Sequence, residues 1–149
     1  MAVVITHSPA ETEQVGAKIA AAVSGGQVVA LYGGMGMGKT VLVRGMATVL
    51  APHAQVSSPT FALVNEYPAE TSGAPALVHF DMYRITGWDD LYSSGFFEYI
   101  DAGAVVVTEW SENIEAALPE NTVRVRFTRL SDTDRQIETE GILDETVSG

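Results

Sequence analysis

The sequence has 149 residues, 46% of them hydrophobic, with a formal net charge of −11 at pH 7 and no cysteine. This length is typical of one domain with its own core, and no apolar run is long enough to cross a membrane. The first residues carry neither a basic region nor a long apolar segment, so no export signal is expected. The lack of cysteine excludes disulfides and thiolate metal sites, and we expect a cytoplasmic protein with no membrane association.

The acidic balance also bears on nucleic acids. Lysine occurs only at Lys18 and Lys39. A sequence-independent nucleic-acid surface needs clustered Lys and Arg to displace counterions, so any nucleic acid should be held by another protein. The acidity serves either solubility or a basic protein partner, and composition does not choose between them.

The first predicted elements are an edge strand over residues 2–6 and a capped helix. Ser8, Pro9 and Glu11 form a capping-box pattern with proline at the first helical position. Apolar residues then recur at helical spacing until Gly25-Gly26, where we expect the helix to end.

An apolar strand over residues 27–32 leads into the stretch LYGGMGMGKT, which matches the P-loop pattern G-x-x-x-x-G-K-[ST]. Glycines let backbone N–H groups approach phosphate oxygens, and the N-terminus of the following helix adds favourable charge. Lys39 would reach the β- and γ-phosphates, and the Thr40 hydroxyl would ligate Mg²⁺. The residues expected to contact the nucleotide here are Gly33, Gly34, Met35, Gly36, Met37, Gly38, Lys39, Thr40 and Val41.

The remaining pattern alternates short strands with short helices. The helix after the P-loop should stop near Ala51-Pro52, and Ser111 is the expected N-cap of a short helix that ends at Leu118. Strands are expected over 60–67, 76–81, 104–110, 123–130 and 135–140, the last two as an antiparallel pair. Helical turns are expected over 88–94 and 95–100. A loop is expected over 68–75, and a frayed tail from about 141 to 149.

Together these elements predict an α/β fold in a single domain over residues 1–149. The expected architecture is a P-loop NTPase-like mixed sheet, with a mostly parallel centre, antiparallel edges and flanking helices. Few crossover helices are long enough for an all-parallel sheet, which is why the edges should be antiparallel. The P-loop should lie at the carboxyl ends of the parallel strands.

Two acids end apolar strands and would therefore reach the edge that holds the P-loop. Asp81 and Glu109 are the candidates for the carboxylate that holds Mg²⁺ or its water. Mg²⁺ prefers hard oxygen ligands and keeps several waters, so Thr40, one or two carboxylates and phosphate oxygens would complete its shell. Spacing does not settle which acid binds the metal and which orients the attacking water.

Four other side chains are weaker candidates. Thr60 lies in a proline-stiffened turn, where its hydroxyl either senses the γ-phosphate or is an ordinary turn residue. Trp110 supports the site, contacts a partner or belongs to the core, and Arg84 faces phosphate or pairs with Asp81. His79 should pack within its strand and is a poor ligand candidate, because no partner stands at metal-site spacing.

Several separated motifs resemble the TsaE family (formerly YjeE), small bacterial P-loop ATPases that serve threonylcarbamoyl modification of adenosine in tRNA. The resemblance runs from Ser8 to about Phe127, and its SPTF and HFDMYR segments are more specific than the P-loop. The matching stretches are the Ser8–Ala20 helix with Glu11-Thr12, LYGGMGMGKT followed by Val43-Arg44-Gly45, SPTFALVNEY at 58–67, HFDMYR at 79–84, Leu91 to Gly95 leading to Glu98-Tyr99, and Thr108-Glu109-Trp110 with Leu118-Pro119 behind.

The resemblance implies that the loop binds ATP, with Thr40 and Glu109 as Mg²⁺ ligands and Asp81 as an acid needed for hydrolysis. It makes Thr60 part of a nucleotide-sensitive switch and Trp110 a neighbour of the site. Residues around Pro9–Thr12, with Thr12 among them, and Arg135 are weaker candidates for adenine contacts. The implied partner is the TsaD–TsaB heterodimer, which performs the carbamoyl transfer while the ATPase resets the complex, so tRNA is contacted only indirectly.

The chain departs from that family at two loop positions, where Gly34 replaces the usual Asp and Met37 the usual Ala. Affinity or rate could change, but Lys39 and Thr40 are untouched. A GTPase is excluded because the chain has no Asn-Lys-x-Asp motif. A small-molecule kinase is disfavoured because residues 52–104 contain one arginine, Arg84. A nucleotide-gated switch with negligible turnover stays open.

Overall fold

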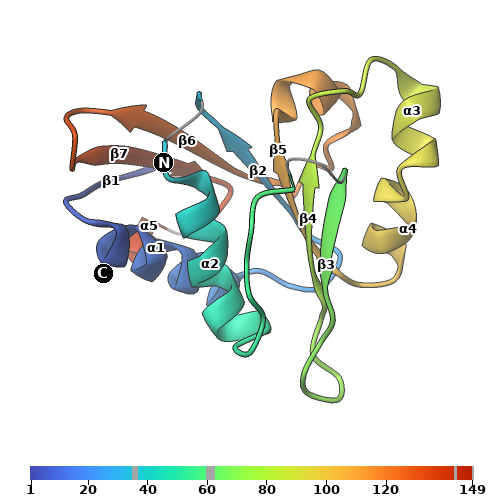
Figure 1. The fold of residues 1–149 in the computed structure, drawn as a ribbon, viewed down its shortest axis with the longest axis horizontal. Helices are drawn as coiled ribbons and strands as arrows, with labels where there is room; N and C mark the ends of the chain where they lie inside the picture. Colours follow the sequence, from blue (N-terminus) through green and yellow to red (C-terminus); the bar gives the residue numbers. More distant parts are fainter. Residues whose placement is uncertain (35–36, 60–62, 143, 149) are drawn as a thin grey trace.

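The computed structural model describes residues 1–34, 37–59, 63–142 and 144–148. Within these ranges, one seven-stranded sheet runs in the order β1-β7-β6-β2-β5-β4-β3 (Figure 1). The strands are β1 (Ala2–Thr6), β2 (Val28–Tyr32), β3 (Val64–Tyr67), β4 (Leu77–Asp81), β5 (Val105–Glu109), β6 (Val123–Arg129) and β7 (Arg135–Glu140). The helices are α1 (Pro9–Ala22), α2 (Lys39–Leu50), α3 (Trp88–Ser93), α4 (Phe96–Asp101), α5 (Asp144–Ser148) and the 3₁₀ helix η1 (Ser111–Ala117).

The directions of the strands confirm the expected mixed sheet. β6, β2, β5 and β4 are parallel neighbours, whereas β7 and β1 at one side and β3 at the other pair antiparallel. None of the helices in the described ranges is long and apolar enough to cross a bilayer.

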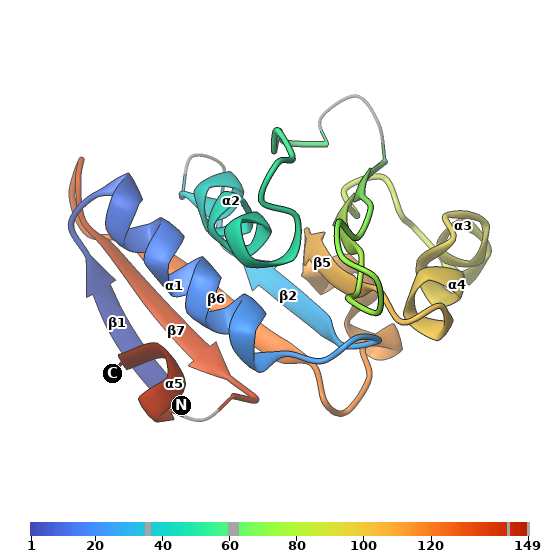
Figure 2. The same ribbon diagram turned by 90° about the horizontal axis from the view of Figure 1, so that it is seen from below.

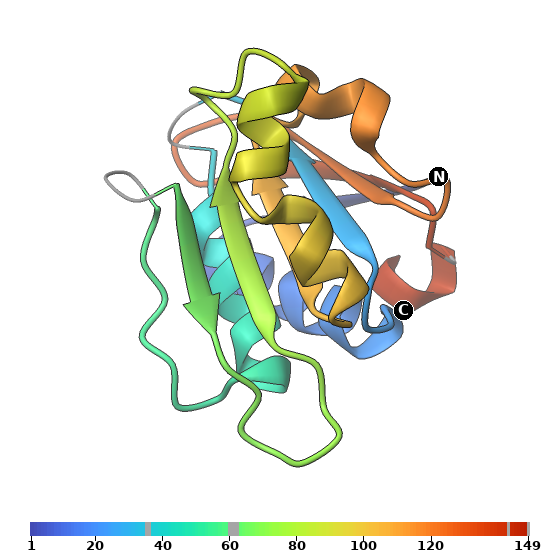
Figure 3. The same ribbon diagram turned by 90° about the vertical axis from the view of Figure 1, so that its right-hand side faces the viewer.

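Helices cover both faces of the central strands, which explains why those strands are apolar throughout rather than alternating. Successive side chains of β2 point to opposite faces, so Val28 packs with α3, α4 and η1 while Val29 packs with α1 and α2. Figures 2 and 3 show these two layers, with α1, α2 and α5 on one face and α3 and α4 on the other.

Two glycines let α1 and α2 cross in close backbone contact. A Cβ at Gly16 would lie 2.1 Å from the carbonyl oxygen of Leu42, and one at Gly45 would lie 2.0 Å from that of Glu13. Neither distance is possible for a real side chain, so both positions require glycine. This crossing holds the start of α2, and with it the P-loop lysine, against α1.

Three local expectations need correction. The capping box is shifted, because Ser8 accepts from the Glu11 N–H (3.2 Å) as predicted but the Glu11 carboxylate accepts from His7 (2.8 Å) rather than from Ser8. Ser111 caps no helix, because its hydroxyl lies 3.0 Å from the carbonyl oxygens of both Leu31 and Thr108 in the sheet and donates its one proton there. The C-terminal segment, expected to fray, forms α5, whose Val147 is buried in the core.

Candidate functional site

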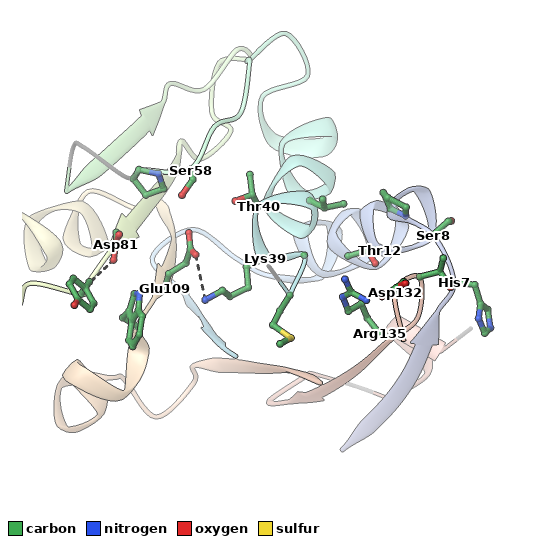
Figure 4. Close-up of a pocket in the computed structure, with 18 of the residues that line it drawn as sticks. His7, Ser8, Thr12, Lys39, Thr40, Ser58, Asp81, Glu109, Asp132 and Arg135 are labelled. Atoms are coloured by element: carbon green, nitrogen blue, oxygen red, sulfur yellow. Dashed lines mark hydrogen bonds and ion pairs between the residues drawn. The ribbon is translucent and has the colours of Figure 1, made fainter. Parts of the chain in front are cut away.

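A cleft of about 1290 Å³ opens where the parallel strands end. Figure 4 shows Asp81 and Glu109 at one end of it, His7 and Arg135 at the other, and Lys39 and Thr40 between. We call Lys39, Thr40, Asp81 and Glu109 the strand end, and His7, Ser8, Thr12, Asp132, Thr133 and Arg135 the turn end. The other lining residues are Pro9, Met37, Gly38, Val41, Ser58, Pro59, Leu63, Tyr83, Arg84 and Trp110.

The backbone at the first and last glycines of the P-loop pattern, Gly33 and Gly38, adopts positive φ angles. Gly33 has a φ of 137°, and a Cβ there would lie 3.1 Å from the Cβ of Phe127. Gly38 has a φ of 95° and caps α2 without any side-chain hydrogen bond. Because glycine has no side chain to accept from them, the first N–H groups of α2 have no side-chain cap at this position. This helix end is therefore suited to an anion.

Lys39 is a buried cation at the strand end, with 7% of its surface exposed. Its Nζ donates to the Gly33 carbonyl oxygen (2.8 Å) and lies 3.6 Å from Oε1 of Glu109. The same Nζ lies 6.0 Å from the ring centroid of Trp110, whose ring meets Tyr83 edge-on at 4.9 Å. The P-loop pattern places the lysine ammonium beside phosphate oxygens. Here the ammonium lies between a loop carbonyl and a carboxylate.

Glu109 is equally buried, and two basic side chains surround its carboxylate. Oε2 lies 2.7 Å from Nε2 of the fully buried His79, opposite the Lys39 contact. Burial, the largest influence, raises the pKa of Glu109, but the contacts with His79 and Lys39 outweigh it and hold the pKa below its ordinary value. Glu109 is therefore a carboxylate at neutral pH.

Asp81 lies beside Glu109 in the parallel pairing of β4 and β5 but is more exposed. Its Oδ1 accepts the Tyr83 N–H (2.9 Å), which turns the chain away from the strand. The Met82 N–H donates to the Glu109 carbonyl, and the Asn113 amide donates to the Met82 carbonyl, both at 2.9 Å. The carboxyl ends of β4 and β5 are thereby fixed to each other.

The oxygen atoms at the strand end suit Mg²⁺, because the Thr40 hydroxyl and the two carboxylates are hard ligands in one cleft. Over the described ranges, no three His, Cys, Asp or Glu side chains gather into a metal site. Protein groups alone would leave an octahedral ion short of ligands. The Thr40 hydroxyl and the two carboxylates could supply part of an octahedral Mg²⁺ shell, with water or other oxygen ligands completing it.

The turn end consists of loop and helix-start residues. The Thr12 hydroxyl shares a buried hydrogen bond with Thr6 (2.8 Å), and Arg135 donates to the carbonyls of Ser131 and Asp134. His7 Nδ1 lies 3.0 Å from Oδ1 of Asp134, and this hydrogen bond raises the pKa of His7 and lowers that of Asp134. A bridge thus joins the start of α1 to the β6–β7 turn.

The cleft brings together most of the residues predicted from sequence. Lys39, Thr40, Met37, Gly38 and Val41 line it with Asp81, Glu109, Trp110 and Arg84, and the weaker candidates Thr12 and Arg135 line its far end. Gly33 contributes the carbonyl that binds Lys39, and Gly34 does not line the cleft. Met35, Gly36 and Thr60 lie outside the described residues.

Sequence reasoning missed the contact between His79 and Glu109. In the parallel pairing of β4 and β5, His79 lies opposite Val107, and Asp81, two residues later, lies opposite Glu109. The only signal for the contact was this pairing. Away from the cleft, Arg124 pairs with Glu115 and Arg126 pairs with Glu140.

Comparisons with known proteins agree on one family. Residues 6–137 match the family model described as "Threonylcarbamoyl adenosine biosynthesis protein TsaE". The chain is 33% identical over 133 residues to the tRNA threonylcarbamoyladenosine biosynthesis protein TsaE of Treponema pallidum, covering 89% of this chain and 96% of that one. It is 34% identical over 132 residues to the protein of the same name from Bacillus subtilis, covering 89% and 80%. The crystal structure of Bacillus subtilis YdiB superimposes with a TM-score of 0.71 at 28% identity, over 97% of this chain and 87% of that one.

Proposed function

The chain belongs to the TsaE family of threonylcarbamoyl adenosine biosynthesis proteins, and from that premise we propose that it binds and hydrolyses Mg-ATP in the cleft. The observation that carries the proposal is the strand end, where the buried Lys39 and the ionised Glu109 share the cleft with Thr40. Triphosphate binding requires a fixed cation, a hydroxyl and a carboxylate beside a helix N-terminus with uncapped N–H groups.

Each side chain has a role that follows from its surroundings. Lys39 would exchange its bond to the Gly33 carbonyl for phosphate oxygens. Thr40 and Glu109 would hold Mg²⁺, which supplies charge neutralisation to the phosphates when bound. Asp81, the more exposed acid, would orient the attacking water and accept its proton. Thr60 as a γ-phosphate sensor remains a prediction, as does a cytoplasmic location.

The partner we propose is the TsaD–TsaB heterodimer, with this chain as the ATPase that resets it and not as the transferase. The net charge of −11 supports an indirect relation to tRNA, since the phosphate backbone would be repelled.

Calorimetric titration with Mg-ATP, followed by phosphate release with and without purified TsaD–TsaB, tests this function. We expect binding in both conditions and release that is slow alone and faster with the heterodimer. Bound nucleotide without release in either condition would favour the pure switch. Phosphate found on an added small-molecule acceptor would favour a kinase, and no nucleotide binding would refute the proposal.

A further inference from the structure

The outer surface of α3 and α4 carries three aromatic side chains in a row. Trp88 and Tyr92, one helical turn apart on α3, are 52% and 60% exposed. Their ring centroids lie 6.3 Å apart, and the Tyr92 ring lies 4.8 Å from that of Phe97 on α4. We call Trp88, Tyr92 and Phe97 the aromatic ladder; Figure 3 shows the two helices that carry it.

Phe97 is partly buried against the core, but core packing does not account for Trp88 and Tyr92, because other residues of the same helices already fill the core. Leu91 and Phe96 are 2% and 0% exposed, and Phe96 meets Phe80 edge-on at 6.0 Å. Contiguous aromatic surface left in water is uncommon on a monomer and marks interaction sites. Trp and Tyr are also the residues that most often carry the binding energy of protein interfaces.

The charged residues on α3 and α4 are all acidic. Four exposed acids lie on or beside the two helices, and the sequence has no Lys or Arg between Arg84 and Arg124. These acids are Asp89, Asp90, Glu98 and Asp101. Such a surface repels nucleic acid and anionic lipid.

A second copy of this chain also fits poorly. A two-fold contact through the ladder would bring its acids against the same acids. A head-to-tail contact would need a basic patch elsewhere, yet Arg124 and Arg126 already pair with Glu115 and Glu140. The occupant that remains is a different protein with Lys or Arg around an apolar groove.

We propose that the aromatic ladder and its acids form the docking surface for a basic groove on a partner protein. Resting on the function proposed above, that partner is the TsaD–TsaB heterodimer. Trp88 would enter the groove, where an arginine can stack on its face, and the acids would steer the approach.

The ladder is connected to the nucleotide site by a short segment. Residues 82–87 lead from Asp81 directly to Trp88, and this segment is anchored to β5 through the Met82 N–H and to η1 through Asn113. A partner on the ladder would therefore dock on helices that follow directly after the segment leaving the strand end of the cleft.

The test is calorimetric binding of purified TsaD–TsaB to the full chain with Mg-ATP present. Trp88→Ala with Tyr92→Ala should weaken binding by about 30-fold or more. Asp89→Lys with Glu98→Lys removes no packing and should weaken binding at low salt, with less effect as salt rises. Val3→Ser on β1, 54% exposed, and Glu145→Lys on α5 are matched controls far from the ladder (Figure 1) and should bind like wild type.

The outcomes separate the docking surface from the function on which it rests. All variants should keep wild-type affinity for Mg-ATP, which shows that the cleft is intact. If the heterodimer binds wild type and both ladder variants equally, the docking surface is wrong and the ATPase proposal stands. If it does not bind wild type at all, the docking surface and the proposed partner are both wrong, whereas nucleotide binding is unaffected.

Discussion

The two ends of the cleft are built in opposite ways. At the strand end, Lys39 and Glu109 are 7% and 9% exposed, and their contacts join residues far apart in the sequence. At the turn end the side chains of His7 and Asp132 are 62% and 94% exposed, and Arg135 bonds to residues of its own turn. Buried charge pairs hold one geometry because separating them is costly, whereas exposed pairs contribute little.

From this difference we expect the phosphates and the nucleoside of a bound nucleotide to gain their binding energy at different ends of the cleft. If the cleft binds ATP as proposed, the strand end would offer fixed charge to the phosphates, and the turn end would offer adaptable contacts to the nucleoside beyond them. Inorganic tripolyphosphate has the phosphates of ATP without the nucleoside, so comparing the two ligands separates the ends. The changes below run from the largest expected effect to the smallest.

Lys39→Ala should lower the affinity for both ATP and tripolyphosphate by about 100-fold or more, because the buried charge-assisted contact is lost and the Glu109 carboxylate remains. Calorimetric titration measures it. Lys18→Ala, at the other lysine of the chain, is the control. Unchanged affinity in Lys39→Ala would contradict the assignment of the strand end as the phosphate-binding part of the cleft.

The two acids should differ from each other. Glu109→Gln should remove the Mg²⁺ dependence of nucleotide affinity, while Asp81→Asn should keep it, and each should slow phosphate release by about 100-fold. Titrations with and without Mg²⁺ distinguish them. If Asp81→Asn alone abolished the Mg²⁺ dependence, the roles of the two acids would be exchanged.

Gly45→Ala tests the crossing that holds the two ends together. A Cβ would lie 2.0 Å from the Glu13 carbonyl oxygen, so α1 and α2 must separate, at a cost of about 1–3 kcal/mol in the free energy of unfolding. Gly87→Ala is the control, because nothing lies within 4 Å of a Cβ there. Urea unfolding measures both; equal stabilities would mean that the crossing adapts easily.

Arg135→Ala should lower ATP affinity by only about 3–10-fold and leave tripolyphosphate affinity unchanged, since its hydrogen bonds to the Ser131 and Asp134 carbonyls are local and the residue is partly exposed. Parallel titrations with the two ligands provide the measurement. A matching loss for tripolyphosphate would mean that the turn end also contacts phosphates.

The smallest effect should come from the bridge between His7 and Asp134. Hydrogen bonding to Asp134 raises the pKa of His7 above its ordinary 6.5, so this stabilisation is present below that pH and is lost as pH rises through the raised pKa. The lowered pKa of Asp134 means that it also fades as pH falls through that value. The difference in Tm between wild type and His7→Asn should therefore be larger at about pH 5 than at about pH 9, and should shrink with salt. A difference independent of pH would assign it to packing.

Much of the strand end followed from sequence because its signals are local. The spacing from Gly33 to Thr40 and the acids that end two apolar strands are visible in single stretches of chain. The parallel order β6-β2-β5-β4 then brings those stretches to one edge, as expected for this class of sheet. The turn end depended on the resemblance, because no local pattern relates Thr12 to Arg135.

The local errors share one cause. Ser111 has the sequence context of an N-cap, yet its hydroxyl bonds to the sheet because β2 passes beside it. The last residues show no helical pattern of their own, but Val147 is buried in the core where α5 contacts α1 and β1. This packing explains why the segment is helical. Both outcomes depend on neighbours that are distant in sequence.

The sequence by itself located the glycine-rich loop between β2 and α2, the strands, and the acids at the ends of β4 and β5, because periodicity, glycine spacing and strand ends are properties of short segments. Only the tertiary structure decided that His79 and Lys39 approach Glu109 from its two sides, and that Trp88 and Tyr92 face water. Those facts depend on which strands are neighbours and which helix face is covered, and long-range packing fixes both.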